Sequence, residues 1–310
     1  MALQYWHNKG MPRTKILALD GAYHGDTFGA MAVGERGIFT KPFHSLLFDV
    51  ETIDFPSADH EQDVLNQFEK KIATGDVAAF IYEPLVQGAS GMRIYSAALL
   101  EQLLQAAKKQ GIVCIADEVF TGFGRTGKLF ASHYCSTPPD IMAVSKGITG
   151  GFMPLGVTSC SREIVSAFES GDVLKTFFHG HSYTANPIAC AAANASFELL
   201  IDEECQTRIT RISELHQQFV YKYVGHQSLV AVKCLGTILS MELKSEEGTA
   251  YLNSLRQKIY PYFLEKKILL RPLGNVIYVL PPYCITDDQL HEIYAAIGSF
   301  LDELQKYQSA

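Results

Sequence analysis

The sequence predicts an α/β fold in which a mostly parallel sheet is followed by a smaller α+β C-terminal domain. Short apolar runs alternate with helical patterns over about the first two thirds of the chain, and this pattern changes after about residue 201. The length of 310 residues also exceeds that of one ordinary domain. We therefore expect a large domain over residues 1–200 and a small domain over residues 201–310.

The composition excludes several classes of protein. Hydrophobic residues make up 47% and charged residues 19% of the chain, which is typical of a globular protein. The net charge of −7 contains no block of Lys or Arg, so we expect no nucleic acid partner. No apolar run is long enough to cross a membrane, no secretory signal begins the chain, and the scattered cysteines indicate reduced thiols. A cytoplasmic protein is therefore expected.

Four short apolar runs predict buried parallel strands, over residues 16–19, 78–82, 112–116 and 141–144. A helix lies between the second and third strands, with Ser96 as its N-cap and Gly111 at its end. The apolar stripe of this helix consists of Leu99, Leu100, Leu103, Leu104 and Ala107. Strand, helix and strand with short links form the βαβ unit of a parallel sheet.

The remaining elements are predicted from capping and apolar patterns. A helix begins at Asn186 and Pro187, and the last helix begins at Thr286, where Gln289 completes a capping box. The other predicted elements are strands over 229–234, 237–243, 268–271 and 276–280 and a helix over 249–266.

Polar or aromatic residues follow each of the four parallel strands. They are Tyr23 with His24 and Gly25, then Glu83, then Asp117 with Glu118, and finally Lys146. Ligands of open parallel sheets bind outside the carboxyl ends of the strands. Any one of these residues is explained by a strand that ends in solvent, but all four in glycine-rich surroundings favour one site.

A lysine and an aspartate at neighbouring strand ends suit one cofactor in particular. A lysine amine forms a Schiff base with an aldehyde, and pyridoxal phosphate also needs an acid beside its ring nitrogen. Such a pair also occurs as a plain ion pair, so the flanking sequence decides between the two interpretations.

The flanking sequence resembles the signature of the class III, fold type I, pyridoxal-phosphate aminotransferases. The resemblance lies in residues 117–127, 139–141 and 145–151, and the spacing of Asp117 and Lys146 suits it. Within this class, residues 23–31, 83–93, 179–187 and 271–278 are similar to the aminotransferases of biotin biosynthesis. The resemblance extends over essentially the whole chain.

This resemblance implies a fold type I enzyme that binds pyridoxal phosphate and forms a homodimer with shared active sites. It implies 8-amino-7-oxononanoate as the amino acceptor and S-adenosylmethionine as the probable donor. Lysine is an alternative donor. Another class III aminotransferase, acting on an ω-amino acid such as ornithine or 4-aminobutyrate, is the alternative enzyme.

The resemblance also implies roles for single residues. Lys146 would hold the cofactor aldehyde and move a proton, and Asp117 would pair with the ring nitrogen. Val119 would pack on one ring face, while Tyr23 would stack near the ring and border the substrate. The alternative for Tyr23 is a packed core tyrosine.

Four further positions carry implied roles. Gly180 would line the substrate cleft, while His181 and Ser182 would reach the cofactor phosphate of the partner subunit. Arg271 would bind the substrate carboxylate in a bidentate manner. The alternative interpretation of Arg271 is an arginine on the surface without a role in binding. The spacing of His179 and His181 suits a metal pair, but no third ligand follows, so no metal is expected.

Three other charged residues have structural interpretations. Glu83 either pairs with the substrate-binding arginine or is a structural charge, and Glu118 and Arg125 are candidates for structural ion pairs. Residues 1–20 contain no counterpart of the family's Gly/Ser-rich phosphate loop. We therefore expect a chain that lacks the family's N-terminal segment and exposes apolar surface, and a catalytically impaired fragment is the alternative to an active enzyme.

Overall fold

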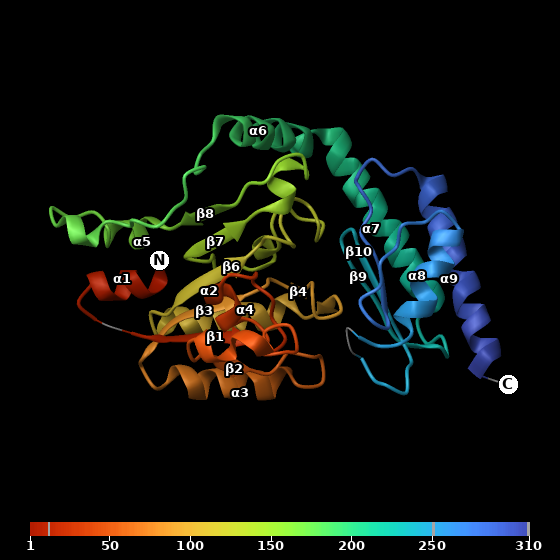
Figure 1. Cartoon of the computed structure of the whole chain (residues 1–310), viewed down its shortest axis with the longest axis horizontal. Helices are drawn as coiled ribbons and strands as arrows, with labels where there is room; N and C mark the ends of the chain where they lie inside the picture. Colours follow the sequence, from red (N-terminus) through yellow and green to blue (C-terminus); the bar gives the residue numbers. More distant parts are fainter. Residues whose placement is uncertain (12, 250–251, 309–310) are drawn as a thin grey trace. The chain divides into compact units, whose positions relative to one another are not determined.

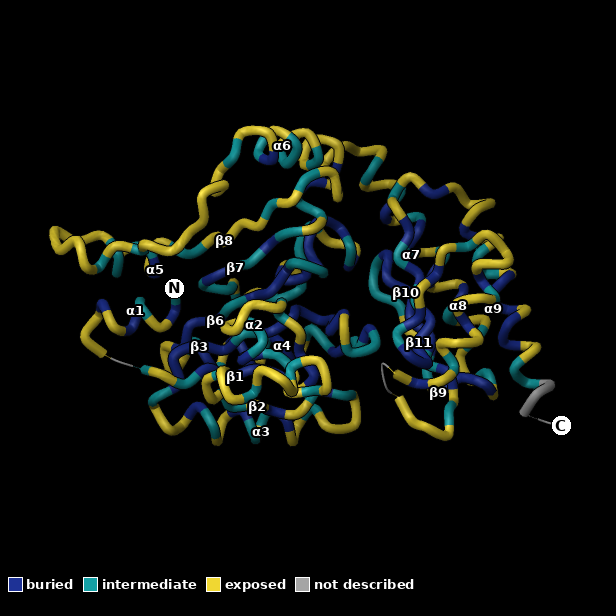
Figure 2. The backbone as a smooth tube through the Cα atoms, viewed as in Figure 1, coloured by how far each residue is buried: buried dark blue, intermediate teal, exposed yellow. Residues whose placement is uncertain are grey.

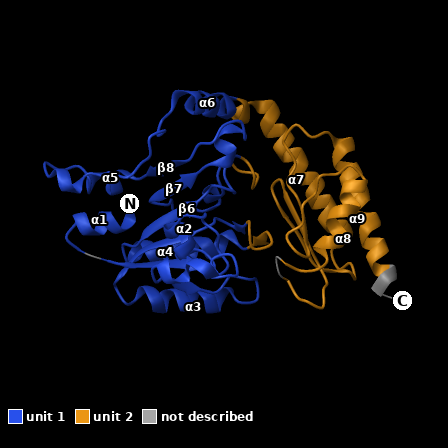
Figure 3. Ribbon diagram, in the orientation of Figure 1, with its two compact units in different colours: residues 1–87, 95–123, 130–198 blue, residues 88–94, 124–129, 199–310 orange. Residues whose placement is uncertain are grey.

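The computed structural model describes residues 1–11, 13–249 and 252–308. They form two compact units, shown in Figure 3. The large unit consists of Met1–Gln87, Tyr95–Phe123 and Phe130–Glu198, and the small unit of Gly88–Ile94, Gly124–Leu129 and Leu199–Ala310. Whether these units are independent domains divided at residue 200 stays a prediction, because compactness does not show independent folding.

The large unit contains a six-stranded sheet with the order β2-β1-β3-β6-β7-β8 (Figure 1). Its strands are β1 (Lys15–Leu19), β2 (Glu51–Ile53), β3 (Val77–Tyr82), β6 (Val113–Asp117), β7 (Ile141–Val144) and β8 (Val157–Cys160). Neighbouring strands are parallel except β7 and β8, which are antiparallel. The four predicted strands and the mostly parallel sheet are thus confirmed. Strands β2 and β8 were missed because they are too short and too polar to form apolar runs.

Helices precede, connect and follow these strands along the chain. They are α1 (Ala2–Asn8), α2 (Phe28–Val33), α3 (Glu61–Ile72), α4 (Ala97–Lys109), α5 (Arg162–Ser166) and α6 (Pro187–Ile201), with 3-10 helices η1 (Lys41–Leu46), η2 (Ala131–Tyr134), η3 (Lys146–Thr149) and η4 (Val173–Lys175). Strand β4 (Val86–Gln87) also lies in the large unit, whereas β5 (Arg93–Ile94) lies in the small unit.

Helix α4 confirms the capping and stripe predictions. The Ser96 hydroxyl oxygen accepts the backbone N–H of Leu99 at 3.1 Å, and every residue of the predicted apolar stripe is buried. Each fully buried leucine of this kind contributes about 2 kcal/mol to stability. Strands β3 and β6 are buried along most of their length, as parallel strands covered on both faces must be (Figure 2).

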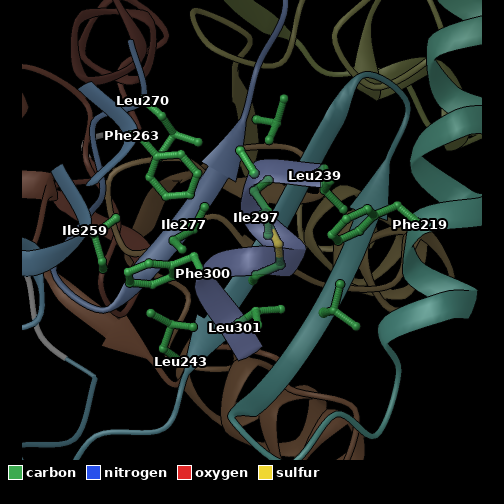
Figure 4. Close-up of a cluster of buried hydrophobic side chains, with 14 of the residues drawn as sticks. Phe219, Leu239, Leu243, Ile259, Phe263, Leu270, Ile277, Ile297, Phe300 and Leu301 are labelled. Atoms are coloured by element: carbon green, nitrogen blue, oxygen red, sulfur yellow. The ribbon is translucent and has the colours of Figure 1, made fainter. Parts of the chain in front are cut away.

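The small unit contains the antiparallel strands β9 (Leu229–Leu235), β10 (Ile238–Leu243) and β11 (Val276–Val279) in the order β11-β10-β9. Its helices are α7 (Glu203–Tyr223), α8 (Arg256–Glu265) and α9 (Asp287–Gln308). One apolar core joins the sheet to these helices. In Figure 4, Phe219 of α7, Phe263 of α8 and Phe300 of α9 lie among the side chains of β10 and β11.

One prediction for the small unit was wrong and another was wrong in part. Residues 268–271 form no strand, because Ile268 N–H bonds to Phe263 O at the end of α8 and Pro272 has no N–H to donate. The helix predicted over 249–266 begins only at Arg256, and residues 250–251 lie outside the described part. The capping box is confirmed, since Thr286 and Gln289 exchange hydrogen bonds at 3.0 and 3.2 Å.

A fully buried histidine, His216 of α7, bonds to helix α9 and to the turn between β9 and β10. Its Nε2 lies 3.2 Å from the carbonyl oxygen of Thr237, which can only accept, so Nε2 carries the proton. Its Nδ1 then accepts the hydroxyl proton of Tyr294 at 2.6 Å. Burial lowers the pKa of His216 to about 4.

We predict that acid destabilises the protein through His216. The unfolded histidine binds a proton near pH 6.5, whereas the folded one does not until about pH 4, so stability falls as the pH falls between these values. The expected loss is about 2 kcal/mol between pH 7 and pH 5. Urea unfolding of the wild type and of His216→Gln measures it, and the exposed His60→Gln is the control. An equal pH dependence in wild type and His216→Gln would contradict the prediction.

Candidate active site

The carboxyl ends of β1 and β6 place His24 against Asp117. Nδ1 of His24 lies 2.7 Å from Oδ2 of Asp117, and both side chains are almost completely buried. The other carboxylate oxygen, Oδ1, accepts the backbone N–H of Val119 at 3.1 Å. Both oxygens of Asp117 therefore have a protein donor, which fixes the plane of the carboxylate.

His24 is a site residue that the sequence analysis noted but gave no role. An ionised Asp117 can only accept, which assigns the proton to Nδ1 of His24. Nε2 of His24 is buried and has no hydrogen-bond partner among the described residues. Its only signal in the sequence is its place five residues after β1, because its contact with Asp117 joins positions 93 apart.

The loop that carries Tyr23 is held in place by two side chains that follow β3 in the chain. Oε1 of Glu83, which is 4% exposed, accepts the backbone N–H of Tyr23 at 3.0 Å. The side-chain amide of Gln87 donates to the carbonyl oxygen of Asp20 at 3.0 Å. These contacts favour the structural interpretation of Glu83, since its carboxylate orients the backbone of the loop.

The ring of Tyr23 faces solvent. The residue is 45% exposed, and its hydroxyl donates to Oδ2 of Asp26 at 3.0 Å. The alternative of a packed core tyrosine was therefore wrong, and the ring is free to border a ligand.

Lys146 begins η3 directly after β7, and its side chain is exposed. Strand β7 pairs in parallel with β6, so Lys146 and Asp117 lie at the ends of neighbouring strands. The Lys146 backbone has a φ of +44°, a conformation rare for residues other than glycine. A Cβ atom at Gly147 would lie 2.9 Å from Cβ of Phe123, so only glycine fits beside Lys146.

Glu118 and Arg125 hold loops in place through neutral partners. The fully buried carboxylate of Glu118 accepts the hydroxyl of Thr121 and the backbone N–H groups of Ala131 and Ser132 at 2.6–3.1 Å. Arg125, in the small unit, donates to Pro281 O at 2.8 Å. These hydrogen bonds go to backbone and hydroxyl groups, not to the ion-pair partners that the sequence suggested.

The structure brings Tyr23, Asp117, Val119 and Lys146 to one edge of the large-unit sheet. Three other predicted residues, Gly180, His181 and Ser182, are exposed in the large-unit segment between η4 and α6, whereas the exposed Arg271 belongs to the small unit. Across residues 1–11, 13–249 and 252–308, no group of three His, Cys, Asp or Glu residues is placed to hold a metal ion. The sheet edge therefore presents an amine and a fixed carboxylate at the ends of neighbouring strands, which suits chemistry on an aldehyde or a ketone.

Comparisons with known proteins agree on one family. The model of the family "Aminotransferase class-III" matches residues 1–301. The adenosylmethionine-8-amino-7-oxononanoate aminotransferase of Synechococcus elongatus is 47% identical, over 98% of this chain and 73% of the relative. The Helicobacter pylori protein of the same name is 35% identical, over 96% and 70%.

Solved structures extend this similarity to the fold. The adenosylmethionine-8-amino-7-oxononanoate aminotransferase of Methanocaldococcus jannaschii is 33% identical with a TM-score of 0.89, covering 97% of this chain and 71% of that one. An amine transaminase from an uncultivated Pseudomonas species, solved in a PLP-bound form, is 29% identical with a TM-score of 0.89, covering 97% and 72%. The α/β fold of fold type I transaminases is thereby confirmed.

We predict that Glu118→Ala destabilises the chain by about 3 kcal/mol, because it leaves two buried N–H groups and one hydroxyl without an acceptor. Chemical denaturation measures the loss. The control is Glu169→Ala, which removes an exposed ion pair to Arg162 at 2.8 Å and is expected to cost less than about 1 kcal/mol. Similar losses in the two variants would show that burial of the acceptor does not decide the effect.

Proposed function

The chain belongs to the class III aminotransferases, and from this membership we propose that it transfers an amino group to 8-amino-7-oxononanoate. The product is 7,8-diaminononanoate, the amino donor is S-adenosylmethionine, and the step belongs to biotin biosynthesis. The observation that carries this proposal is the 47% identity to a curated enzyme of that name over 98% of the chain.

Pyridoxal phosphate is the cofactor of this enzyme family. When bound, it supplies a ring that accepts electrons from the carbon that loses its proton. The residues at the sheet edge fit this group. The Lys146 amine is exposed, the Asp117 carboxylate is fixed by two donors, and the Tyr23 ring is open to solvent at the same end of the sheet.

The roles of the residues follow from their chemistry. The Lys146 amine would hold the cofactor aldehyde carbon and then move a proton at the substrate Cα. The carboxylate of Asp117 would pair with the protonated ring nitrogen, and His24 would keep that carboxylate in position. Val119 would pack against the ring, and Tyr23 would border ring and substrate.

The remaining predicted residues concern substrate and partner. Gly180 would line the substrate cleft, and Arg271 would bind the substrate carboxylate through its planar guanidinium group. His181 and Ser182 would donate to the cofactor phosphate of the partner subunit. These assignments rest on the resemblance of the surrounding motifs.

We further propose a cytoplasmic homodimer with shared active sites. Large apolar residues of the large unit are exposed over residues 152–188, which favours a partner (Figure 2). They are Phe152, Val157, Val173, Leu174, Phe178, Tyr183 and Ile188. Within the described ranges, no helix is both long and apolar enough to cross a membrane.

We predict that borohydride reduction of the chain with pyridoxal phosphate attaches the cofactor to Lys146, which peptide mass spectrometry detects. Prior addition of S-adenosylmethionine should remove this adduct, because amino transfer from the donor releases the lysine. Product analysis with 8-amino-7-oxononanoate should then give 7,8-diaminononanoate. Lys146→Ala is the matched control and should give no specific adduct.

Other outcomes of this experiment have distinct meanings. Adducts spread over surface lysines would contradict the Lys146 site. Removal of the adduct by lysine alone would change the donor, and conversion of ornithine or 4-aminobutyrate alone would identify another class III enzyme. A Lys146 adduct without any conversion would favour the catalytically impaired fragment.

We predict that His24→Phe binds pyridoxal phosphate about tenfold more weakly, because one hydrogen bond to the charged Asp117 is lost. Fluorescence titration of the cofactor measures this affinity. His24→Asn keeps an N–H near the position of Nδ1 and should recover part of the loss. Wild-type affinity in His24→Phe would show that the contact has no effect on the cofactor site.

A further inference from the structure

A short segment after Asp117 leaves the large unit and returns to it. Residues Gly124–Leu129 belong to the small unit, whereas Phe123 before them and Phe130 after them belong to the large unit (Figure 3). Gly124 N–H bonds to Leu129 O at 3.1 Å, which closes the segment into a loop. We call residues 124–129 the anchor segment.

The anchor segment is held tightly within the small unit. The carbonyl oxygen of Arg125 accepts both the backbone N–H and the hydroxyl of Thr237, at 2.9 and 3.2 Å. The guanidinium of Arg125 donates to Pro281 O at 2.8 Å and lies 4.9 Å from the centroid of the Tyr283 ring. Because Thr126 and Thr237 are fully buried, little room remains for the segment to move.

The contact with Gly236 leaves the least room. A Cβ atom at Gly236 would lie 2.1 Å from the carbonyl carbon of Thr126 and 2.2 Å from the nitrogen of Gly127. Both are backbone atoms that cannot rotate away, so any side chain at this position must displace the anchor segment. Gly236 also has a positive φ of +57°, which alone would favour glycine.

The other end of this connection reaches the candidate active site. The Phe123 ring packs against Phe130 with 5.4 Å between centroids, and Cβ of Phe123 occupies the space beside Gly147. Phe123 and Gly124 both have positive φ values, +59° and +92°. The neighbouring Lys146 is strained as well, and strained backbone persists only where its surroundings hold it.

We propose that the anchor segment holds Phe123 against Gly147 and thereby maintains the backbone conformation of Lys146. Gly236 and Arg125 are then positioning residues, since they touch no reacting atom and act through Phe123. This inference rests on the proposed role of Lys146. The rival explanation is that the anchor segment stabilises only the small unit.

The test compares Gly236→Ala with Gly225→Ala in the full chain loaded with pyridoxal phosphate. Gly225 lies in the small unit with a φ of +78° and no atom within 4 Å of an added Cβ, so its substitution adds similar backbone strain without displacing the anchor segment. We expect Gly236→Ala to lower kcat roughly tenfold to hundredfold. It should also shift the absorption band of the bound cofactor and its pH titration, whereas Gly225→Ala should leave all three at wild-type values.

A second readout needs no cofactor. Competitive acetylation measures the reactivity of the Lys146 amine in the unloaded protein, and it should change several-fold in Gly236→Ala but not in Gly225→Ala. If wild-type Lys146 gives no cofactor adduct, the proposed function fails, but acetylation still tests the connection from the anchor segment to Lys146.

Unchanged spectra and unchanged Lys146 reactivity in a folded Gly236→Ala would overturn the proposal. If that variant does not fold, Arg125→Met serves instead, because it removes the Pro281 and Tyr283 contacts and leaves the backbone intact. Smaller changes in kcat, in the cofactor spectrum and in the reactivity of Lys146 would then support the proposal. Loss of thermal stability with wild-type spectra and reactivity would assign the anchor segment to the small unit alone.

Discussion

Parallel pairing of β1, β3, β6 and β7 is the constraint on which the candidate site depends. It brings the carboxyl ends of four strands to one edge, so residues far apart in the chain become neighbours. Asp117 ends β6, Glu83 comes directly after β3, and His24 and Lys146 lie within five residues of the ends of β1 and β7. The order of strands in the sheet therefore brings these residues to one end of the sheet, before any loop contact is considered.

Three buried carboxylates then fix the loops at that edge. Glu83 binds the loop of Tyr23, and Asp117 is held by His24. Glu118 accepts a backbone N–H at the start of η2. A buried carboxylate is costly unless its oxygens accept hydrogen bonds, and each of these three accepts at least one. The need to satisfy the carboxylates thus orders the loops at this end of the sheet.

Much of this arrangement could be predicted from the sequence, because some signals are local. Buried parallel strands are continuous apolar runs, and the Ser96 cap and the Thr286 capping box lie within a few residues of what they bind. The His24 contact with Asp117 could not be predicted, since one hydrogen bond across 93 residues leaves no pattern in a single sequence. The partners of Glu118 could not be predicted either. Its carboxylate accepts backbone N–H groups, which every residue except proline has and which therefore leave no signal in the sequence. Residues 268–271 looked like a strand, but Ile268 bonds back to the end of α8.

The discontinuous small unit has a consequence for the order of synthesis. Its segments Gly88–Ile94 and Gly124–Leu129 are made early, yet their partners in the small unit, such as Val276 beside Gly91 and Thr237 beside Arg125, come much later. Contacts between residues so distant in sequence form slowly, because a long loop must close first. A ribosome-bound chain that ends near residue 198 therefore carries two loops without their partners. On the proposed role of the anchor segment, the Lys146 backbone reaches its final conformation only after the last third of the chain has emerged.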